Sequence, residues 1–129
     1  MSKLQVLIAD DHEIMRRGIR AVLESRDDIE VSEAENGREA VDKALQQQPN
    51  LVILDVSMPV LDGFSAAREI KTAYPHLPIL ILSLNRTEAF TDVAKKIGIS
   101  GYISKMDAGR TLLEAVDNVL KDRSFFVTP

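Results

Sequence analysis

Five short apolar runs recur along this chain, and each is followed by a stretch with helical periodicity. The runs begin near residues 4, 29, 51, 78 and 101, so that 22 to 27 residues separate their starts. That separation suits one strand followed by one helix. Because strands connected in this way run parallel and their right-handed crossovers place helices on both faces of the sheet, the pattern predicts a doubly wound α/β fold.

The stretch after the first run shows the helical pattern clearly. Met15, Ile19 and Leu23 recur at intervals of four residues and form one apolar face. We therefore expect a helix here, with Arg16 on the opposite face and in water. The second apolar run, at residues 29–34, alternates apolar and polar side chains, which predicts a more exposed strand.

Length and composition exclude several classes of protein. The chain has 129 residues, 45% of them hydrophobic, which fits one globular domain with one core. It has no cysteine, which excludes a disulfide framework, a thiol nucleophile and a cysteine-based metal site. The formal net charge of −4 argues against binding nucleic acid through a broad basic surface. The first apolar run is too short for a signal peptide or a membrane span, so we expect a cytoplasmic protein with no membrane partner.

The domain organisation is simple in this interpretation. Residues 1–121 contain all five predicted strand–helix units and form one domain. Residues 122–129 are expected to be a tail or the start of a linker.

Polar side chains stand where four of the five apolar runs end. Asp10 and Asp11 follow the first run, Asp55 the third, Ser83 the fourth and Lys105 the fifth. Each alone has an ordinary structural explanation, such as a helix cap, a turn residue or a surface charge. Because ligands bind beyond the carboxyl ends of the strands in an open parallel sheet, the joint placement predicts a functional site.

These residue types suit phosphoryl chemistry on a carboxylate. Three converging carboxylates repel one another unless a cation lies among them, and oxygen ligands favour Mg²⁺. With that charge compensated, one Asp side chain can act as a nucleophile toward phosphorus. Lys105 and Ser83 would then balance and hydrogen-bond the phosphoryl oxygens.

The chain closely resembles bacterial two-component response-regulator receiver domains over nearly its whole length. The resemblance is carried by Asp10-Asp11, Asp55 with Met58-Pro59 and Asp62-Gly63, Ser83, and Tyr102 three residues before Lys105. It implies a flavodoxin-like fold with strand order 2-1-3-4-5. It also implies a signalling phosphoprotein rather than an enzyme, with a sensor histidine kinase as its phosphodonor.

The resemblance implies a role for each residue of the metal site. Asp55 would be the phosphoacceptor. Asp11 and Asp55 would ligate Mg²⁺ directly, Asp10 would act through water, and the Ser57 carbonyl would complete the protein ligands. Ser57 and Asn85 flank the site and are expected to influence how long the phosphoryl group persists.

The remaining roles concern the phosphoryl group and the response to it. Lys105 and Ser83 would bind the phosphoryl oxygens. Ser83 and Tyr102 would form the switch pair, which alters the face made by the fourth helix, the fifth strand and the fifth helix. Phosphorylation then shifts the population between two arrangements of that face.

Three segments resemble the LuxR/FixJ (NarL)-type subgroup, whose receivers usually precede a helix-turn-helix domain. They are IADDHEIMRRG, ILSLN and GYISK. DNA would then be contacted only through a C-terminal domain, and no helix-turn-helix pattern follows Lys121. The chain is thus interpreted either as the receiver of a longer transcription regulator or as a stand-alone receiver that acts through protein partners. A phosphorylation-dependent homodimer is compatible with both.

Two rival functions have weaker sequence support. A haloacid dehalogenase-type phosphatase would need Asp-x-Asp after the first strand, where this chain has Asp10-Asp11-His12. A flavin- or nucleotide-binding module would need a phosphate-binding loop rich in small residues, but the first loop is acidic. His12 and His76 have no partner at metal-ligand spacing, so we expect both to be surface residues.

Overall fold

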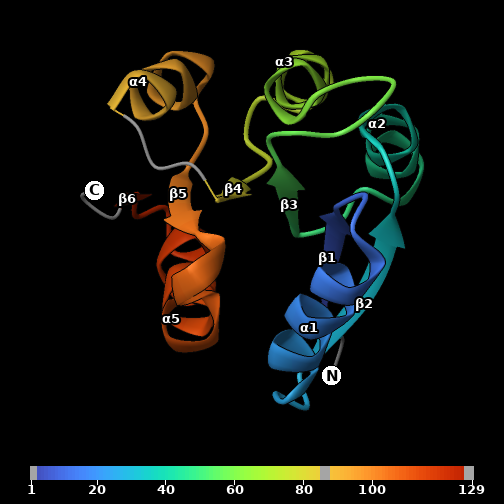
Figure 1. The fold of residues 1–129 in the computed structure, drawn as a ribbon, viewed down its shortest axis with the longest axis vertical. Coiled ribbons are helices and arrows are strands. Elements are labelled where there is room, and N and C mark those ends of the chain that lie inside the picture. The colour runs from blue at the N-terminus through green and yellow to red at the C-terminus, as the bar shows by residue number, and fades with distance from the viewer. Residues whose placement is uncertain (1–2, 85–87, 127–129) are drawn as a thin grey trace.

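Strands and helices alternate along the chain as far as the last helix (Figure 1). The structure, a computed structural model, describes residues 3–84 and 88–126. The strands are β1 (Leu4–Ala9), β2 (Ile29–Ala34), β3 (Leu51–Asp55), β4 (Ile79–Ser83), β5 (Gly101–Ser104) and β6 (Phe125–Phe126). The helices are α1 (Glu13–Glu24), α2 (Gly37–Gln47), α3 (Gly63–Ala73), α4 (Glu88–Ile97) and α5 (Ala108–Leu120), with a 3-10 turn at Lys105–Asp107.

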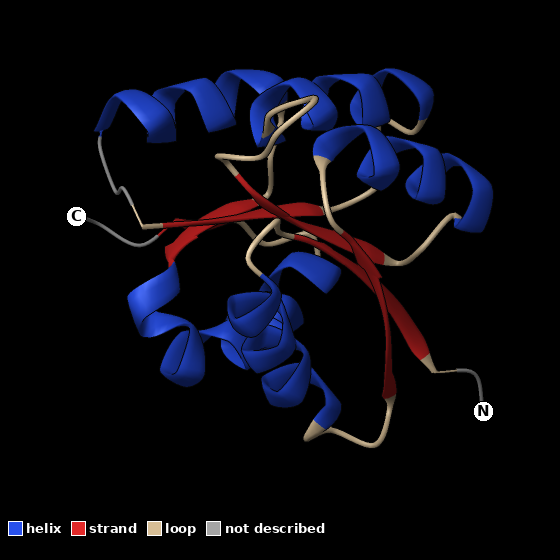
Figure 2. Ribbon diagram, turned by 45° about the vertical axis from the view of Figure 1, so that its right-hand side comes forward, coloured by secondary structure: helices blue, strands red, loops and turns tan. Residues whose placement is uncertain are grey.

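All the strands pair in parallel in one sheet. Their order is β2-β1-β3-β4-β5-β6, which confirms the predicted order of the first five strands. The order reverses at β1, because the chain moves outward to β2 on one side and then to β3 on the other. Helices cover both faces of the twisted sheet (Figure 2).

The sheet separates two apolar cores. Within β1, Leu7 and Ala9 face the core under α2, α3 and α4, whereas Val6 and Ile8 face the core under α1 and α5. This alternation uses both faces of the strand, as expected for a parallel sheet covered on each side. It also explains why the apolar runs are nearly continuous.

Local sequence signals fix where several helices begin and end. The Asn36 side chain accepts a hydrogen bond from the Glu39 backbone N–H at 2.8 Å and caps α2. The Asp62 side chain caps α3 by accepting from the Ser65 backbone N–H at 2.9 Å. Gly98 follows α4 with φ of 91°, a left-handed conformation that favours glycine.

The segment after α5 forms a short strand that the sequence did not predict. Phe125 and Phe126 pair with Gly101 and Tyr102 and add the short strand β6 to the edge of the sheet. The Lys95 ammonium lies 5.2 Å from the centroid of the Phe126 ring, a cation–π contact that ties this strand to α4. Part of the predicted tail is therefore packed on the domain; its last residues, 127–129, lie outside the described residues.

The prediction that Arg16 faces water is wrong. Arg16 is only 7% exposed, and its guanidinium lies between α1 and β2. Nε donates to Glu33 Oε1 at 2.6 Å, and Arg20 donates to the other oxygen of the same carboxylate at 2.5 Å. A buried guanidinium is stable when its donors and its charge are satisfied in this way.

None of the helices within the described residues has the length and apolar character needed to cross a membrane.

Candidate functional site

The structure brings the predicted site residues to one edge of the sheet. Asp55 and Ser83 are the last residues of β3 and β4, while Asp10 directly follows β1 and Lys105 directly follows β5. Because the strands are parallel and adjacent, their carboxyl ends form one rim. Asp10, Asp55, Ser83 and Lys105 are all buried there.

A glycine fixes the approach of the β3–α3 loop to Asp55. The Gly63 N–H donates to the Val56 carbonyl at 2.8 Å, which folds the loop back on the end of β3. A Cβ atom added at Gly63 would overlap the Asp55 carbonyl oxygen. The Asp62-Gly63 pair thus combines a helix cap with a close backbone approach that holds the position of Asp55.

Lys105 joins the two buried carboxylates. Its Nζ lies 2.8 Å from Asp10 Oδ2 and 3.1 Å from Asp55 Oδ2, and its side chain is 3% exposed. Burial alone would lower the pKa of Lys105, but the hydrogen bond and charge of Asp10, together with the Asp55 charge, outweigh it and raise that pKa. Lys105 is therefore an ammonium held between two carboxylates.

The pKa of Asp55 is raised, although the carboxyl group lies beside the Lys105 ammonium, which by itself would lower it. Burial is the largest influence and raises its pKa, and the nearby Asp10 charge raises it further. The Lys105 charge and the Ser57 backbone N–H oppose this rise without cancelling it. The three carboxylates of Asp10, Asp11 and Asp55 cluster beside a single lysine, and this excess of negative charge favours an additional cation.

Asp11 does not cap helix α1. The N-cap of α1 is His12, and that position makes no side-chain capping hydrogen bond. The Asp11 side chain is 31% exposed and its Oδ1 lies 3.3 Å from the His12 ring Nδ1. A helix cap, one of the structural explanations considered for the polar residues at the strand ends, is therefore not the role of Asp11, and its carboxylate remains available to a ligand.

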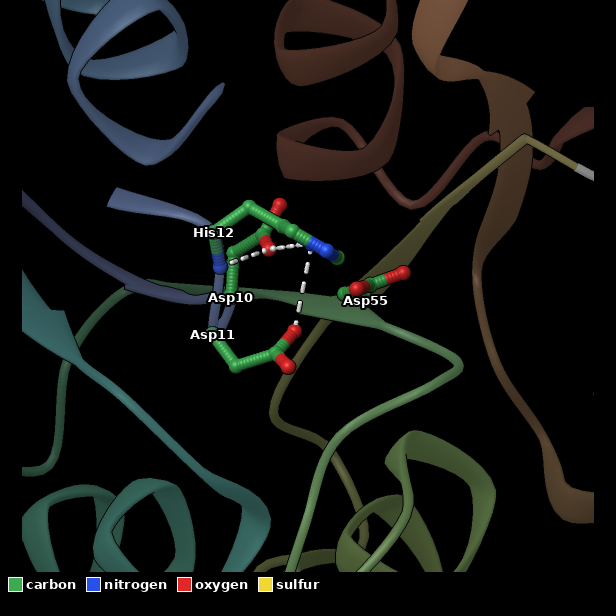
Figure 3. Close-up of side chains that lie close together, drawn as sticks. All are labelled: Asp10, Asp11, His12 and Asp55. Atoms are coloured by element: carbon green, nitrogen blue, oxygen red, sulfur yellow. Dashed lines mark hydrogen bonds and ion pairs between the residues drawn. The ribbon is translucent and has the colours of Figure 1, made fainter. Parts of the chain in front are cut away.

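His12 lies against the acid pair, a contact that its place in the sequence did not predict. Its side chain is 66% exposed, as expected for a surface residue, but its ring Nδ1 lies 3.3 Å from Asp10 Oδ1 as well as from Asp11 Oδ1 (Figure 3). Potential ligand atoms of Asp10, Asp11, His12 and Asp55 all lie within 4.8 Å of one another. The sequence signal for this contact is the position of His12 directly after Asp10 and Asp11. That position alone does not indicate that the ring points toward the two carboxylates.

Arg16 supports the loop that carries the acid pair. Its Nη1 donates to the Asp10 carbonyl at 2.7 Å, while Nε is bound to Glu33 of β2. The His12 backbone N–H donates to Asp10 Oδ1 at 2.9 Å. Both the backbone and the carboxylate of Asp10 are therefore fixed before any ligand binds.

Ser83 and Tyr102 lie on the neighbouring strands β4 and β5. Ser83 is 3% exposed and pairs in register with Ser104, and Tyr102 is 1% exposed within the core under α4. Tyr102 therefore points inward in this structure. Its role as a switch residue stays a prediction, as does the role of the Ser57 carbonyl. Asn85 lies outside the described residues.

The donor set fits Mg²⁺. Asp10, Asp11 and Asp55 offer carboxylate oxygens within one small cluster, and hard divalent cations prefer such oxygens. The partly exposed Asp11 leaves the cluster open to solvent, which suits an ion that keeps several waters. Lys105 compensates part of the charge from the buried side.

Comparison with known families identifies this arrangement. Residues 6–117 match the family described as "Response regulator receiver domain". The transcriptional regulatory protein DegU of Brevibacillus brevis is 31% identical over 125 residues, which cover 96% of this chain. The match spans only 53% of DegU, so this chain corresponds to about half of that relative.

Solved structures agree with the sequence comparison. A two-component response regulator of the LuxR family from Aurantimonas sp. SI85-9A1 has a TM-score of 0.92 and 30% identity, over 99% of this chain and 91% of that one. The isolated REC domain of RcsB from Salmonella enterica serovar Typhimurium, in the presence of phosphomimetic BeF₃⁻, has a TM-score of 0.87 and 29% identity. That match covers 98% of this chain and 94% of the RcsB chain.

Proposed function

This chain belongs to the response regulator receiver domain family, and from that premise we propose that it accepts a phosphoryl group on Asp55 from a sensor histidine kinase. The observation that carries the proposal is the placement of Asp55 at the centre of the rim, bound to Lys105 at 3.1 Å and clustered with Asp10 and Asp11. Residues 1–121 would be the receiver, and cytoplasm is the compartment that suits it.

The transfer step uses Asp55 as the nucleophile. Its carboxylate oxygen forms a bond to phosphorus as the N–P bond of the donor's phosphohistidine breaks. The electron pair of that bond stays on the departing imidazole nitrogen, which then takes a proton. Asp55 attacks as a carboxylate, whose oxygen carries no proton to be removed, so the nucleophile needs no general base.

The surrounding residues stabilise the charge on the transferred group. Bound Mg²⁺, held by Asp11, Asp55 and the Ser57 carbonyl with Asp10 acting through water, would neutralise phosphoryl oxygens. Lys105 lies on the buried side of Asp55 and would pair with a second oxygen. Ser83, at the end of the next strand, would donate a hydrogen bond to a third.

Exposed apolar side chains surround the acidic pocket and support docking of a protein donor. They lie in the first turn of α1 and in the segments that follow β3, β4 and β5: Ile14, Val60, Leu84 and Met106, with exposed fractions of 88%, 78%, 63% and 83%. An apolar rim around a charged centre is typical of a surface that a partner covers. We place the phosphohistidine of the kinase against this rim.

The output would depend on Ser83 and Tyr102. A hydrogen bond from Ser83 to the phosphoryl group would draw in the β4–α4 loop and stabilise one packing of Tyr102 under α4. The surface made by α4, β5 and α5 would then present a different face to its partner. Because the match spans 53% of DegU, we place a DNA-binding output outside this chain; a stand-alone receiver and a phosphorylation-dependent dimer are the alternatives.

The proposal is tested by incubating the protein with acetyl phosphate, with and without Mg²⁺, and measuring the intact mass. We expect one phosphoryl adduct that requires Mg²⁺. Asp55→Asn is the reactive-site variant, and Asp42→Asn is the matched control because Asp42 is exposed on α2 and is not part of the acidic cluster. An adduct on Asp55→Asn, or none on the folded wild type, would contradict the proposal.

A further inference from the structure

A pocket of about 640 Å³ lies at the edge of the sheet opposite to the acidic cluster. It is bounded by the last turns of α3 and α4, the residues that precede β4 and β5, and the segment after α5. Small-molecule sites in proteins usually have volumes of about 300–1,000 Å³, so this pocket can hold a ligand. We call it the amino-edge pocket; its lining includes Lys71, His76, Lys95, Ser100, Arg123 and Phe126.

The cations that line this pocket have no carboxylate partners. Lys71, Lys95 and Arg123 form no ion pair within residues 3–84 and 88–126. Cations elsewhere on the surface differ, because Arg17 binds a carboxylate at 2.8 Å and Arg20 binds one at 2.5 Å. Three unpaired positive charges are thus gathered at one pocket of a chain whose formal net charge is −4.

Lys71 is the partly buried member of this group. It lies in the last turn of α3, and its ammonium donates a hydrogen bond to the Pro75 carbonyl at 3.2 Å. Burial lowers the pKa of Lys71, and no carboxylate in the described part of the chain offsets this effect as Asp10 and Asp55 do for Lys105. A bound anion would supply the missing negative charge.

Two hydroxyl groups add uncharged donors to the same lining. Ser100 and Ser124 line the pocket, and the side chain of neither makes a hydrogen bond to any described residue. Asp122 is the only carboxylate among the described lining residues, so with His76 neutral the three cations leave two positive charges uncompensated. A phosphate ester group carries a charge of about −1.5 to −2 and three strong acceptor oxygens, which matches both the charge and the donors.

Helix ends explain only part of this positive charge. The dipoles of α3 and α4 favour cations in their last turns, where Lys71 and Lys95 are found. Arg123 belongs to no helix and lines the same pocket. An adjoining hollow between α3 and α4 shares Lys71 and adds Arg68 and Lys96, which also form no ion pair among the described residues. Positive charge from three separate elements therefore converges here.

We propose that the amino-edge pocket binds a phosphate group, free or carried by a small organic molecule, through Lys71, Lys95 and Arg123. The pocket is larger than one phosphate group, which leaves room for an organic part beside Phe126. The inference is independent of the proposed function, because none of these residues belongs to the acidic cluster. A ligand bound here would connect α3, α4 and the segment after α5.

Calorimetry in a metal-free buffer of low ionic strength tests the proposal with three probes: AMP, inorganic phosphate and adenosine. We expect AMP to bind and adenosine, which lacks the phosphate group, not to bind. Tighter binding of AMP than of inorganic phosphate would identify a phosphate ester as the ligand. Binding of AMP no tighter than that of inorganic phosphate would identify the free ion, and both results support the site.

Glutamine variants locate the bound phosphate. Lys71→Gln and Arg123→Gln should each weaken AMP binding by about fivefold or more, because each removes a charge-assisted hydrogen bond. Lys121→Gln is the matched control, since Lys121 is exposed, forms no ion pair with a described residue and does not line the pocket. Its affinity for AMP should stay within a factor of about two of wild type. Arg123 is exposed, so Arg123→Gln remains informative if Lys71→Gln disturbs the fold.

Several results would overturn the inference. It is wrong if neither AMP nor inorganic phosphate binds, or if adenosine binds as tightly as AMP. It is also wrong if Lys121→Gln weakens binding as much as Arg123→Gln, which would indicate an effect of net charge alone. Asp55→Asn should bind AMP like the wild type, and loss of binding in that variant would place the anion at the acidic cluster instead. The proposed function is tested separately, by the Mg²⁺-dependent mass change at Asp55.

Discussion

Replacing Lys105 with methionine tests the charge balance of the pocket. The substitution removes the ammonium and keeps most of the side-chain volume, so the buried space that Lys105 occupies stays filled. What changes is that Asp10 and Asp55, both at most 5% exposed, lose the cation that lies 2.8 Å and 3.1 Å from their oxygens.

The magnitude follows from the two distances. At an effective dielectric constant of about 20, a unit charge pair attracts by about 6 kcal/mol at 2.8 Å and by about 5 kcal/mol at 3.1 Å. The gross loss is offset in part because the variant no longer buries an ammonium. Breaking a buried ion pair by removing one partner costs about 3–5 kcal/mol, and we expect Lys105→Met to lie in that range without metal.

Magnesium should restore much of this loss. The variant leaves carboxylates with no internal cation, so its Mg²⁺ affinity should exceed that of the wild type. A ligand at 100 times its Kd stabilises the native state by about 2.7 kcal/mol. The difference in unfolding free energy between wild type and variant should therefore shrink when Mg²⁺ is added.

Urea unfolding in EDTA and in MgCl₂ measures both effects. Lys96→Met is the matched control, because Lys96 is exposed on α4 and its loss should change stability by no more than about 0.5 kcal/mol. If Lys105→Met is as stable as the wild type in EDTA, or if Mg²⁺ stabilises both proteins equally, the electrostatic reasoning is refuted.

Three further predictions concern the backbone and pH. Gly63→Ala should lower the free energy of unfolding by about 3 kcal/mol, because its Cβ overlaps the Asp55 carbonyl. Gly18→Ala, on the open face of α1, should raise the free energy of unfolding by about 1 kcal/mol. Chemical denaturation that ranks the two variants otherwise contradicts the account. Val60 has φ of 71°, so Val60→Gly should raise the free energy of unfolding by about 1 kcal/mol, and an unchanged urea midpoint would argue against strain there. The pKa of Lys105 is raised in the folded state, so its contribution to stability is full below its ordinary value of 10.5 and is lost as pH rises through the folded-state pKa. Wild type should therefore lose more stability than Lys105→Met in alkaline denaturation. Parallel pH profiles of the two proteins would refute this.

The fold was predictable because its main determinants are local and periodic. Each buried strand, such as β3 and β4, is a continuous apolar run, and each helix presents one apolar face. The caps at Asn36 and Asp62 are also short-range signals. The strand order came from the family resemblance, and the structure confirms it.

Features that depend on distant partners were not predictable. Arg16 reads as a solvent-facing residue on its helix, and its burial depends on Glu33, which follows 17 residues later on β2. The strand β6 needs the edge of β5 to pair with, and a two-residue segment carries no periodicity of its own. Both errors arise because tertiary contacts override local pattern.

In the candidate site, too, the features set by local sequence were predictable and those set by tertiary contacts were not. The positions of Asp10, Asp55, Ser83 and Lys105 follow from the ends of apolar runs, because parallel strands bring those ends together. The orientation of the His12 ring toward the acid pair does not follow from any spacing. It depends on the turn between β1 and α1, where the His12 backbone is extended and its N–H bonds to Asp10.

The central claim is that Asp55 carries the phosphoryl group. Reducing the phosphorylated protein with borohydride converts an aspartyl phosphate into homoserine, and peptide mass spectrometry then locates the change. The account predicts homoserine at position 55 alone, formed only when Mg²⁺ was present during phosphorylation. Homoserine at position 10 or 11, with Asp55 intact, would contradict it.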